Sequence, residues 1–509
     1  MIPAVASEGG ERRDLTRPGC TATGEMTVAA AGLSLVAILA TVVTARKSLH
    51  TDQVIDADIA IHLIETGRPL SCSFAYSVPG EPAPSGWPVY DLALAAWLRV
   101  WGVTPASVAA FYPAIVVVVS LSVCWFLARS RLIVSPRVRV ATVLAMPLLP
   151  AVVSVCVKGR YDAMGMLGLA VALLALVVEG AVARFALLAA GGVTVGAGGF
   201  DVTLASGPFA AMLLVCAGWR RFREAAVFLA CVAAGLGGAF AKMHLDGTLG
   251  DFLECMRLSG VDAAEAVGGR AFRPRVVEPY WLFLALAVSW LGRCRNDAVE
   301  AVPAWKIVTV AVGSSIVVPT FIGAFGHYSK DYRWLSAMPL LGCVAVAASS
   351  VRRPAVRWAL LAAIALPLAS GWPARALSLA CEWDEQDFGR IDRFVGERIE
   401  KEDVVFASYP LYFAVIGRGA DRMVGGAFHR MTEVQKRSIT VAFLSGRGNG
   451  ASALDPTTEE ALKGFGGEWH ETDRILVPRG RLRESIPPAV KNGYCYEVRV
   501  FRRGDGDTR

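Results

Sequence analysis

The sequence has few charged residues for its length, and this shortage excludes an ordinary soluble protein. Asp, Glu, Lys and Arg make up 19% of its 509 residues, whereas soluble domains carry about 25%. Hydrophobic residues make up 54%, and the mean hydropathy is +0.47. We therefore expect a protein that crosses a membrane many times.

The sequence also lacks the motifs of several enzyme and transporter classes. It contains no nucleotide-binding glycine loop, P-loop, G-x-S-x-G elbow, C-x-x-C pair or internal repeat. Several of its eleven cysteines lie in apolar runs, where a thiol behaves as a small hydrophobic group; they are Cys124, Cys156, Cys216, Cys231 and Cys343. We expect no cysteine metal cluster and no certain cofactor, and a divalent metal ion is left open.

Apolar runs of spanning length recur along most of the chain. They cover residues 26–45, 107–127, 138–157, 163–182, 185–200, 203–218, 225–243, 279–292, 305–325, 334–350 and 355–372. Residues 87–102 contain Asp91 and Arg99 among tryptophans and a tyrosine, which favours a helix in the membrane interface. The sequence therefore predicts a polytopic α-helical membrane protein of about eleven spans.

Clusters of arginine between these runs predict the orientation. Short cytoplasmic loops hold the excess of Lys and Arg, and the clusters here are "RSRLIVSPRVR", "RRFR", "RCR" and "VRRPAVR". With 87–102 interfacial, all four lie on the same side as residues 1–25. The net charge of +7 is explained by these clusters without a nucleic-acid partner. The segment "ARK" at 45–47 is the one exception to the pattern.

This orientation divides the chain into three parts. Residues 1–25 are a cytoplasmic tail, 26–372 the transmembrane domain with a large external loop at 46–106, and 373–509 an external domain. In that last part "DEQDFGRIDRFVGERIEKEDVVFAS" predicts a helix and then a strand, and "ETDRILVPRG" another strand. We expect a small α/β domain, with a disulfide between Cys381 and Cys495 as one alternative. The composition is compatible with a bacterial inner membrane protein.

Most of the remaining ionisable residues fall on the external side. They lie in "DQVIDADIAIHL" (52–63), "KGRYD" (158–162), "FD" (200–201), "HLDGTLGDF" (244–252) and "GHYSKDYR" (326–333). Burying a charge at a membrane boundary costs several kcal/mol unless the charge is paired or hydrated. Such a gathering of acids and cations from separate loops predicts a shared external cavity.

The first external loop resembles that of the bacterial polytopic GT-C glycosyltransferases. The matching residues are Asp58, His62, Leu63 and Gly67, followed by "FAYSVPGEP" (74–82) and the amphipathic stretch 87–102. A second register, onto the mannosyltransferase and aminoarabinose-transferase-like branch, matches Asp52 in place of Asp58. The resemblance implies transfer of a sugar from a polyprenyl-phosphate carrier to a glycan, lipid or protein acceptor, with inversion and without paired carboxylates.

The chemistry of such a transfer assigns roles to particular residues. A carboxylate must take the proton of the acceptor hydroxyl, and Asp58 and then Asp52 are the candidates. Cations must neutralise the leaving phosphate, and aromatic rings stack on sugars. The expected substrate-binding residues are His62, Lys158, Arg160, Asp162, His327, Lys330, Arg333, Tyr76 and Trp87.

Each of these residues also has a structural explanation. Asp58 could cap the helix that follows it, Asp56 could be solvated, and Asp162 could satisfy a helix end. Lys158, Arg160 and Arg333 could extend to lipid headgroups, and the aromatic residues could form an interfacial belt. At the level of the whole protein, the alternatives are a flippase for a lipid-linked amphiphile and a non-catalytic assembly protein.

Overall fold

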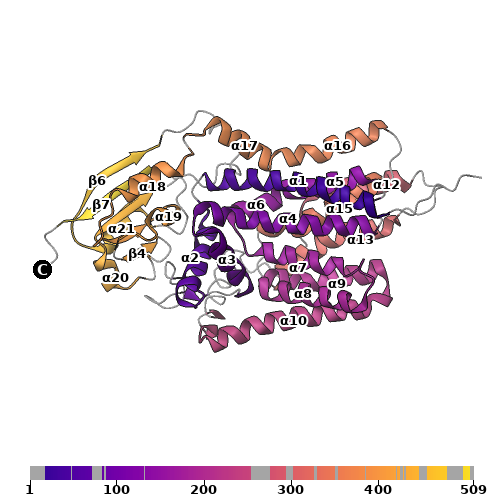
Figure 1. Cartoon of the computed structure of the whole chain (residues 1–509), viewed down its shortest axis with the longest axis horizontal. Coiled ribbons are helices and arrows are strands. Elements are labelled where there is room, and N and C mark those ends of the chain that lie inside the picture. Colours follow the sequence, from indigo (N-terminus) through magenta and orange to yellow (C-terminus); the bar gives the residue numbers. More distant parts are fainter. Residues whose placement is uncertain are drawn as a thin grey trace, which may run out of the picture.

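The protein is a helical bundle with a small sheet-containing domain at one end (Figure 1). The computed structural model describes residues 18–46, 49–71, 83–84, 88–130, 132–133, 135–250, 252–253, 276–293, 302–325, 330–349, 354–384, 386–419, 421–424, 428, 431–445, 456–477 and 497–504.

The bundle is made of apolar helices. They are α1 (Pro18–Ala45), α4 (Pro105–Ser130), α5 (Pro136–Ala145), η1 (Met146–Leu148), α6 (Pro150–Lys158), α7 (Asp162–Leu174), α8 (Ala181–Gly198), α9 (Phe200–Ala217), η2 (Trp219–Arg221), α10 (Phe222–Leu245), α12 (Pro279–Arg293), α13 (Ala304–Val312), η3 (Gly313–Val317), α14 (Val318–Phe325), η4 (Lys330–Arg333), α15 (Trp334–Ser349) and α16 (Pro354–Ala369).

The number of membrane spans depends on how bent and short helices are counted. Five helices of the described chain are long and apolar enough to cross a membrane, or seven if each of two bent pairs is one span. The pairs bend by 45° after η1 and by 50° between α16 and α17 (Trp372–Cys381). Each predicted run coincides with one of these spans or with a shorter apolar helix. The protein is thus an integral membrane protein, but the predicted count of about eleven spans is not confirmed.

Glycines let several of these helices approach one another closely. A Cβ atom on Gly191 of α8 would lie 2.6 Å from the backbone oxygen of Gly168 of α7, and one on Gly196 would meet the backbone of Val232 in α10. The glycine-rich run "LLAAGGVTVGAGG" therefore forms a helix whose glycine face packs closely against α7 and α10, as small residues allow in membranes.

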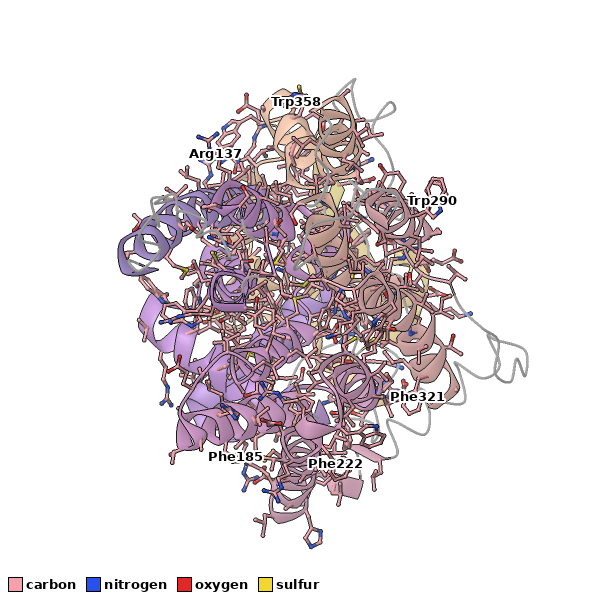
Figure 2. All side chains as sticks on the ribbon, turned by 90° about the vertical axis from the view of Figure 1, so that its right-hand side faces the viewer. Arg137, Phe185, Phe222, Trp290, Phe321 and Trp358 are labelled. Carbon is pink, nitrogen blue, oxygen red and sulfur yellow. The ribbon has the colours of Figure 1, made fainter. Side chains whose placement is uncertain are left out.

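The outer surface of the bundle carries large aromatic side chains. Seen from the end opposite the sheet, Trp290, Trp358, Phe185 and Phe222 project outward (Figure 2). Trp358 and Trp290 are 72% and 65% exposed. Large exposed aromatic side chains distributed around a helical bundle are expected where the surface faces lipid.

The first loop forms its own small unit at the end of the bundle that carries the sheet domain (Figure 1). It contains α2 (Thr51–Thr66), the antiparallel pair β1 (Leu70–Ser71) and β2 (Ala83–Pro84), and α3 (Pro88–Trp101). The helix expected at 87–102 is therefore present, and it packs against α2 and α4.

The C-terminal part contains a five-stranded mixed sheet of order β4-β3-β5-β7-β6. Its elements are α18 (Phe388–Gly396), β3 (Val404–Ala407), η5 (Tyr409–Leu411), α19 (Tyr412–Val415), β4 (Asp421–Val424), α20 (Glu433–Ser438), β5 (Val441–Ser445), α21 (Thr458–Phe465), β6 (Trp469–Leu476) and β7 (Glu497–Arg503). Helices α18 and α19 pack on one apolar face and α21 on the other. The predicted helix, first strand and second strand are present.

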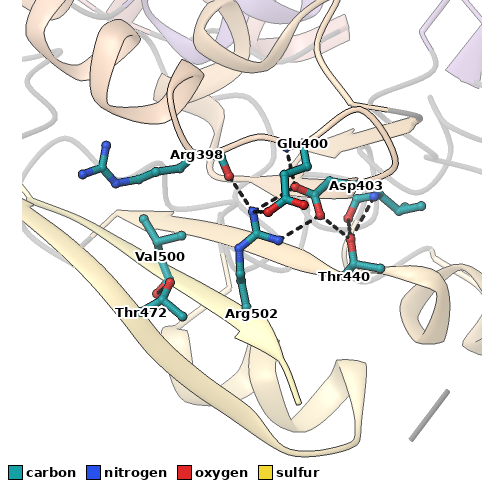
Figure 3. Close-up of polar contacts among 8 residues, drawn as sticks. Arg398, Glu400, Asp403, Thr440, Thr472, Val500 and Arg502 are labelled. Carbon is teal, nitrogen blue, oxygen red and sulfur yellow. Dashed lines mark hydrogen bonds and ion pairs between the residues drawn. The ribbon is translucent and has the colours of Figure 1, made fainter. Parts of the chain in front are cut away.

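A polar cluster ties the strands of this domain together (Figure 3). The Arg502 guanidinium donates to both oxygens of Asp403 at 3.1 Å and contacts Glu400 at 3.1 Å, while Thr440 donates to Asp403 at 3.2 Å. Because every member of the cluster belongs to this domain, we assign the cluster to the stability of the domain and not to catalysis. Cys381 is exposed, and Cys495 lies outside the described residues, so the disulfide suggested between them stays a prediction.

Candidate active site

Helix α2 presents its acidic residues on two different faces. Asp52 and Asp56 are four residues apart and share one face. Asp58 lies six residues after Asp52, so at about 100° per residue it points about 240° around the helix. Asp52 and Asp58, the two candidate bases, therefore point in different directions from α2. We call the surface formed by Asp52 and Asp56 the acid face.

The N-terminus of α2 is fixed against the bundle. His50 is the N-cap, with its Nδ1 accepting from the Asp52 amide at 3.2 Å. Gln53 is fully buried and donates to the backbone oxygen of Cys156 in α6 at 3.2 Å. Gly159, which ends α6 with φ of +67°, leaves the space that the side chains of Gln53 and Tyr112 occupy. The suggestion that Asp58 caps this helix is wrong, since the helix begins at Thr51.

Asp56 belongs to a cluster with two tyrosines from neighbouring helices. Tyr90 of α3 donates to Asp56 Oδ2 at 2.8 Å, and Tyr112 of α4 lies 3.4 Å from the same atom. The two hydroxyls are 2.5 Å apart. Burial raises the pKa of Asp56 well above its ordinary value, the Tyr90 hydrogen bond opposes this, and the nearby charges of Asp91 and Asp52 raise the pKa further. Asp56 is thus not the solvated acid that the sequence indicated.

Asp58 is buried between three segments of the chain. Asp58 is only 3% exposed. Ser71 of β1 donates to its Oδ2 at 2.6 Å, and Tyr412 of α19 donates to its Oδ1 at 2.8 Å. Asp52 is in a different setting, since its side chain is 39% exposed and lies 3.7 Å from the His50 Nδ1. Of the two, Asp52 is the acid that is accessible at the surface of the described chain.

Arg160 carries a positive charge to the same end of the bundle. Its Nε donates to Asp162 at 2.6 Å and its Nη2 to the Tyr332 hydroxyl at 2.9 Å, with its guanidinium carbon 5.0 Å from the centre of the Tyr332 ring. The side chain is 15% exposed, so it does not extend to lipid headgroups. Its charge acts on Asp56, lowering that pKa. The structure therefore brings Arg160 and the acid face together.

Arg333 lies beside a carboxylate that the sequence did not single out. The Arg333 side chain is 55% exposed and its Nε is 4.0 Å from Glu278. Glu278 adopts a φ of +55°, and the preceding Val277 exchanges hydrogen bonds with Ser315 in the π-helical turn η3. Burial raises the pKa of Glu278, while Arg333 opposes the rise. Strained backbone beside a π turn is frequent at functional sites.

The remaining predicted site residues are placed only in part. Lys158 and His62 are partly buried, at the end of α6 and one turn after Asp58 respectively. Tyr76, Trp87, His327 and the side chain of Lys330 lie outside the described residues. In the part of the chain that the structure describes, no group of three or more His, Cys, Asp or Glu could hold a metal ion.

Sequence reasoning missed Tyr112 and Tyr332, and it placed Tyr90 only among the aromatic residues able to stack on a sugar ring. Tyr90, Tyr112 and Tyr332 come from three separate helices, and only their position in the fold brings them to Asp56 and Arg160. One signal was available: the four-residue spacing of Asp52 and Asp56 on a helix places them on one face.

Comparison with known proteins identifies the fold. No family model matches the chain, and no curated protein matches it significantly. ArnT from Cupriavidus metallidurans bound to undecaprenyl phosphate is similar over 93% of this chain and 98% of its own, with 12% identity and a TM-score of 0.57. Its apo form gives 13% identity over 94% and 98%, with a TM-score of 0.54.

A third similar structure comes from a larger protein. A variant of the arabinofuranosyltransferase AftD from Mycobacteria matches 95% of this chain and 42% of its own, with 13% identity and a TM-score of 0.51. At these identities the likeness concerns the fold. The chain therefore has a fold similar to that of ArnT and AftD, which agrees with the resemblance seen in the sequence at the level of the fold.

Proposed function

We propose that this chain, with its GT-C fold, is a membrane glycosyltransferase that moves a sugar from a polyprenyl-phosphate carrier to an acceptor hydroxyl. The observation that carries the proposal is geometric: α2, which bears the acid face, packs through Gln53 against Gly159, the residue next to Arg160, at one end of the bundle. ArnT, the protein of similar fold, has been crystallised with undecaprenyl phosphate, which supports a donor of this class.

In the proposed reaction Asp52 is the general base. The acceptor oxygen attacks the anomeric carbon and loses its proton to Asp52, while the bond from that carbon to the phosphate oxygen breaks on the opposite side of the sugar. One displacement inverts the anomeric centre and releases polyprenyl phosphate. We prefer Asp52 to Asp58 because Asp52 is accessible, whereas both oxygens of Asp58 accept hydrogen bonds from buried donors.

Cationic side chains would hold the departing phosphate. Arg160 is oriented by Asp162 and Tyr332, and a fixed guanidinium stabilises developing charge without reorganising during the reaction. Arg333 adds an exposed guanidinium. Lys158 at the end of α6 completes the set among residues of this end of the bundle, and His327 and Lys330 remain proposed members.

The proposal includes an orientation in the membrane. About eleven spans place residues 1–25 in the cytoplasm and both the loop 46–106 and the domain 373–509 outside the inner membrane of a bacterium. Loop helices and sheet domain lie at the same end of the bundle (Figure 1), which supports a shared side.

Transfer from a defined donor tests the proposal. Purified protein in lipid vesicles is given radiolabelled sugars on polyprenyl phosphate or on a nucleotide, together with a membrane extract as the source of acceptor. We expect labelled acceptor and polyprenyl phosphate from the lipid donor alone. Movement of intact lipid-linked sugar across the vesicle without transfer would indicate a flippase instead, and transfer from the nucleotide donor would contradict the proposed donor class.

A further inference from the structure

The sheet domain holds α2 through the buried carboxylate of Asp58. The hydroxyl of Tyr412, which is fully buried at the start of α19, donates to Asp58 Oδ1 at 2.8 Å. Ser71 donates to Oδ2 at 2.6 Å. The hydrogen bonds therefore join α2, the strand β1 and the C-terminal domain at one point. Two hydrogen bonds from buried donors hold one side chain in a single position, so this point is well suited to fix a helix.

The domain holds the chain a second time just before α2. Arg46, at the end of α1, lies with its Nη1 3.2 Å from Asp387 and its guanidinium carbon 4.4 Å from the centre of the Trp383 ring. The backbone oxygen of Arg46 accepts from the Phe388 amide at 3.1 Å. The contacts at Arg46 and at Asp58 lie at the two ends of residues 46–58, the segment that contains the acid face.

The rotation of α2 about its own axis decides where the acid face points. A helix is rigid over its first two turns, so a side chain fixed at Asp58 also fixes the directions of Asp52 and Asp56. On the bundle side α2 is held at Gln53, which donates to the Cys156 oxygen, and at Asp56, which accepts from Tyr90. The hydrogen bond from Tyr412 adds a restraint from the sheet domain further along the helix. In Figure 1 α2 lies between the bundle and the sheet domain, where it contacts both.

We propose that Asp58 and Tyr412 are positioning residues, through which the C-terminal domain sets the orientation of the acid face toward the substrate. The catalytic consequence rests on the proposed function, whereas the restraint on α2 can be measured without it. Asp58 then acts through Asp52 and does not itself touch the acceptor.

Replacing the single hydroxyl tests this inference. In full-length Tyr412→Phe the ring is kept and the hydrogen bond is lost. We expect faster hydrogen–deuterium exchange in residues 51–66 and a fall in kcat of about tenfold or more, because a misplacement of about 1 Å can cost a factor of about 100. The KM for the lipid donor should stay the same, since the cations that hold the phosphate are not on α2.

A tyrosine elsewhere provides the matched control. Tyr280 donates to the backbone oxygen of Ala363 at 2.5 Å, and Tyr280→Phe removes this hydrogen bond between α12 and α16. It should leave both exchange in α2 and kcat as in the wild type. Unchanged exchange in the Tyr412→Phe protein would overturn the inference, and so would faster exchange with an unchanged kcat. If the wild type transfers no sugar, the proposed function fails and the exchange arm alone decides whether the domain restrains α2.

Discussion

The pKa of Asp56 is raised because its half-buried carboxyl group is desolvated and because Asp91 and Asp52 lie nearby. The folded state therefore binds more protons than the unfolded state between the ordinary pKa of about 4 and the raised one. In this range stability falls as pH rises. We expect the thermal unfolding temperature of the wild type to decrease with pH above about 4, and that of Asp56→Asn to decrease less.

Thermal unfolding of the detergent-solubilised protein across this pH range provides the measurement. Asp246→Asn is the control, since Asp246 pairs with Lys242 at a partly exposed position of α10. It should keep the pH dependence of the wild type. Equal slopes in the wild type and Asp56→Asn would show that Asp56 does not hold the extra proton.

Arg160 is expected to act through the geometry of its guanidinium as well as through its charge. Lysine in its place keeps the charge but loses the fork that reaches Asp162 and Tyr332. Losing one hydrogen bond to a phosphate corresponds to about tenfold weaker binding. Binding of polyprenyl phosphate to Arg160→Lys, measured by calorimetry in detergent, should show this loss. The control is Arg184→Lys, because Arg184 of α8 pairs with Glu224 of α10; this variant should bind polyprenyl phosphate as the wild type does. Equal binding by the two variants would show that Arg160 does not hold the phosphate.

The sequence indicated which single residues carry chemistry, but it did not indicate which residues they contact. It singled out Asp52, Asp58, Arg160 and Asp162, and Arg160 and Asp162 pair as neighbours in the chain can. The contact between Asp58 and Tyr412 spans 354 positions, and no local pattern contains it. Burial of Asp56 likewise depends on rings supplied by two other helices.

The junction of α2 with α6 is closely packed at Gly159. Alanine at Gly159 would meet the side chains of Gln53 and Tyr112 and would also have to adopt a φ of +67°. The left-handed conformation costs about 1–2 kcal/mol, and crowding a packed site adds about 1–3 kcal/mol. We expect Gly159→Ala to lower the unfolding temperature and to displace the N-terminus of α2.

A second glycine separates the cost of the left-handed backbone conformation from the cost of crowding. Gly67 at the end of α2 also has a positive φ, of +78°, but a Cβ there meets nothing within 4 Å. Gly67→Ala should therefore show only the smaller loss, when both variants are compared by thermal unfolding in the same detergent. If Gly67→Ala were as destabilising as Gly159→Ala, the close approach of α2 to α6 would not be the cause.

Hydrophobic runs predicted the helices of the bundle well, because each run is long and its composition is uniform. The same pattern could not show where a helix bends. Pro150 follows η1 at the 45° bend, and Pro367 and Gly371 lie near the 50° bend between α16 and α17. These bends depend on packing as well as on proline, so the number of complete spans does not follow from hydropathy alone.

At the scale of the whole molecule, Arg46 explains the one exception to the arginine pattern. The segment "ARK" lies on the side where few basic residues were expected, and Arg46 there pairs with Asp387 and stacks on Trp383 of the C-terminal part. It therefore serves domain contact, and the remaining basic clusters keep their value for predicting orientation.

The orientation itself can be tested with a native thiol. Cys381 is free and exposed at the end of α17, on the side of the sheet domain, while Arg137 lies toward the opposite end (Figures 1 and 2). In a background without other cysteines, a membrane-impermeant maleimide added to spheroplasts should label Cys381. A cysteine introduced by Arg137→Cys, with Cys381 replaced by serine, should react only after permeabilisation. The reverse pattern would place the sheet domain and the acid face in the cytoplasm.

The rate of sugar transfer by Asp52→Asn tests the central claim most directly. Loss of a general base costs about 100- to 10,000-fold in rate, so we predict that kcat at saturating lipid donor falls by this factor while binding of polyprenyl phosphate is kept. Asp58→Asn, measured beside it, should lose less, since Asp58 only positions α2. Undiminished transfer by Asp52→Asn would contradict the assignment of the base, and abolition by Asp58→Asn alone would transfer that role to Asp58.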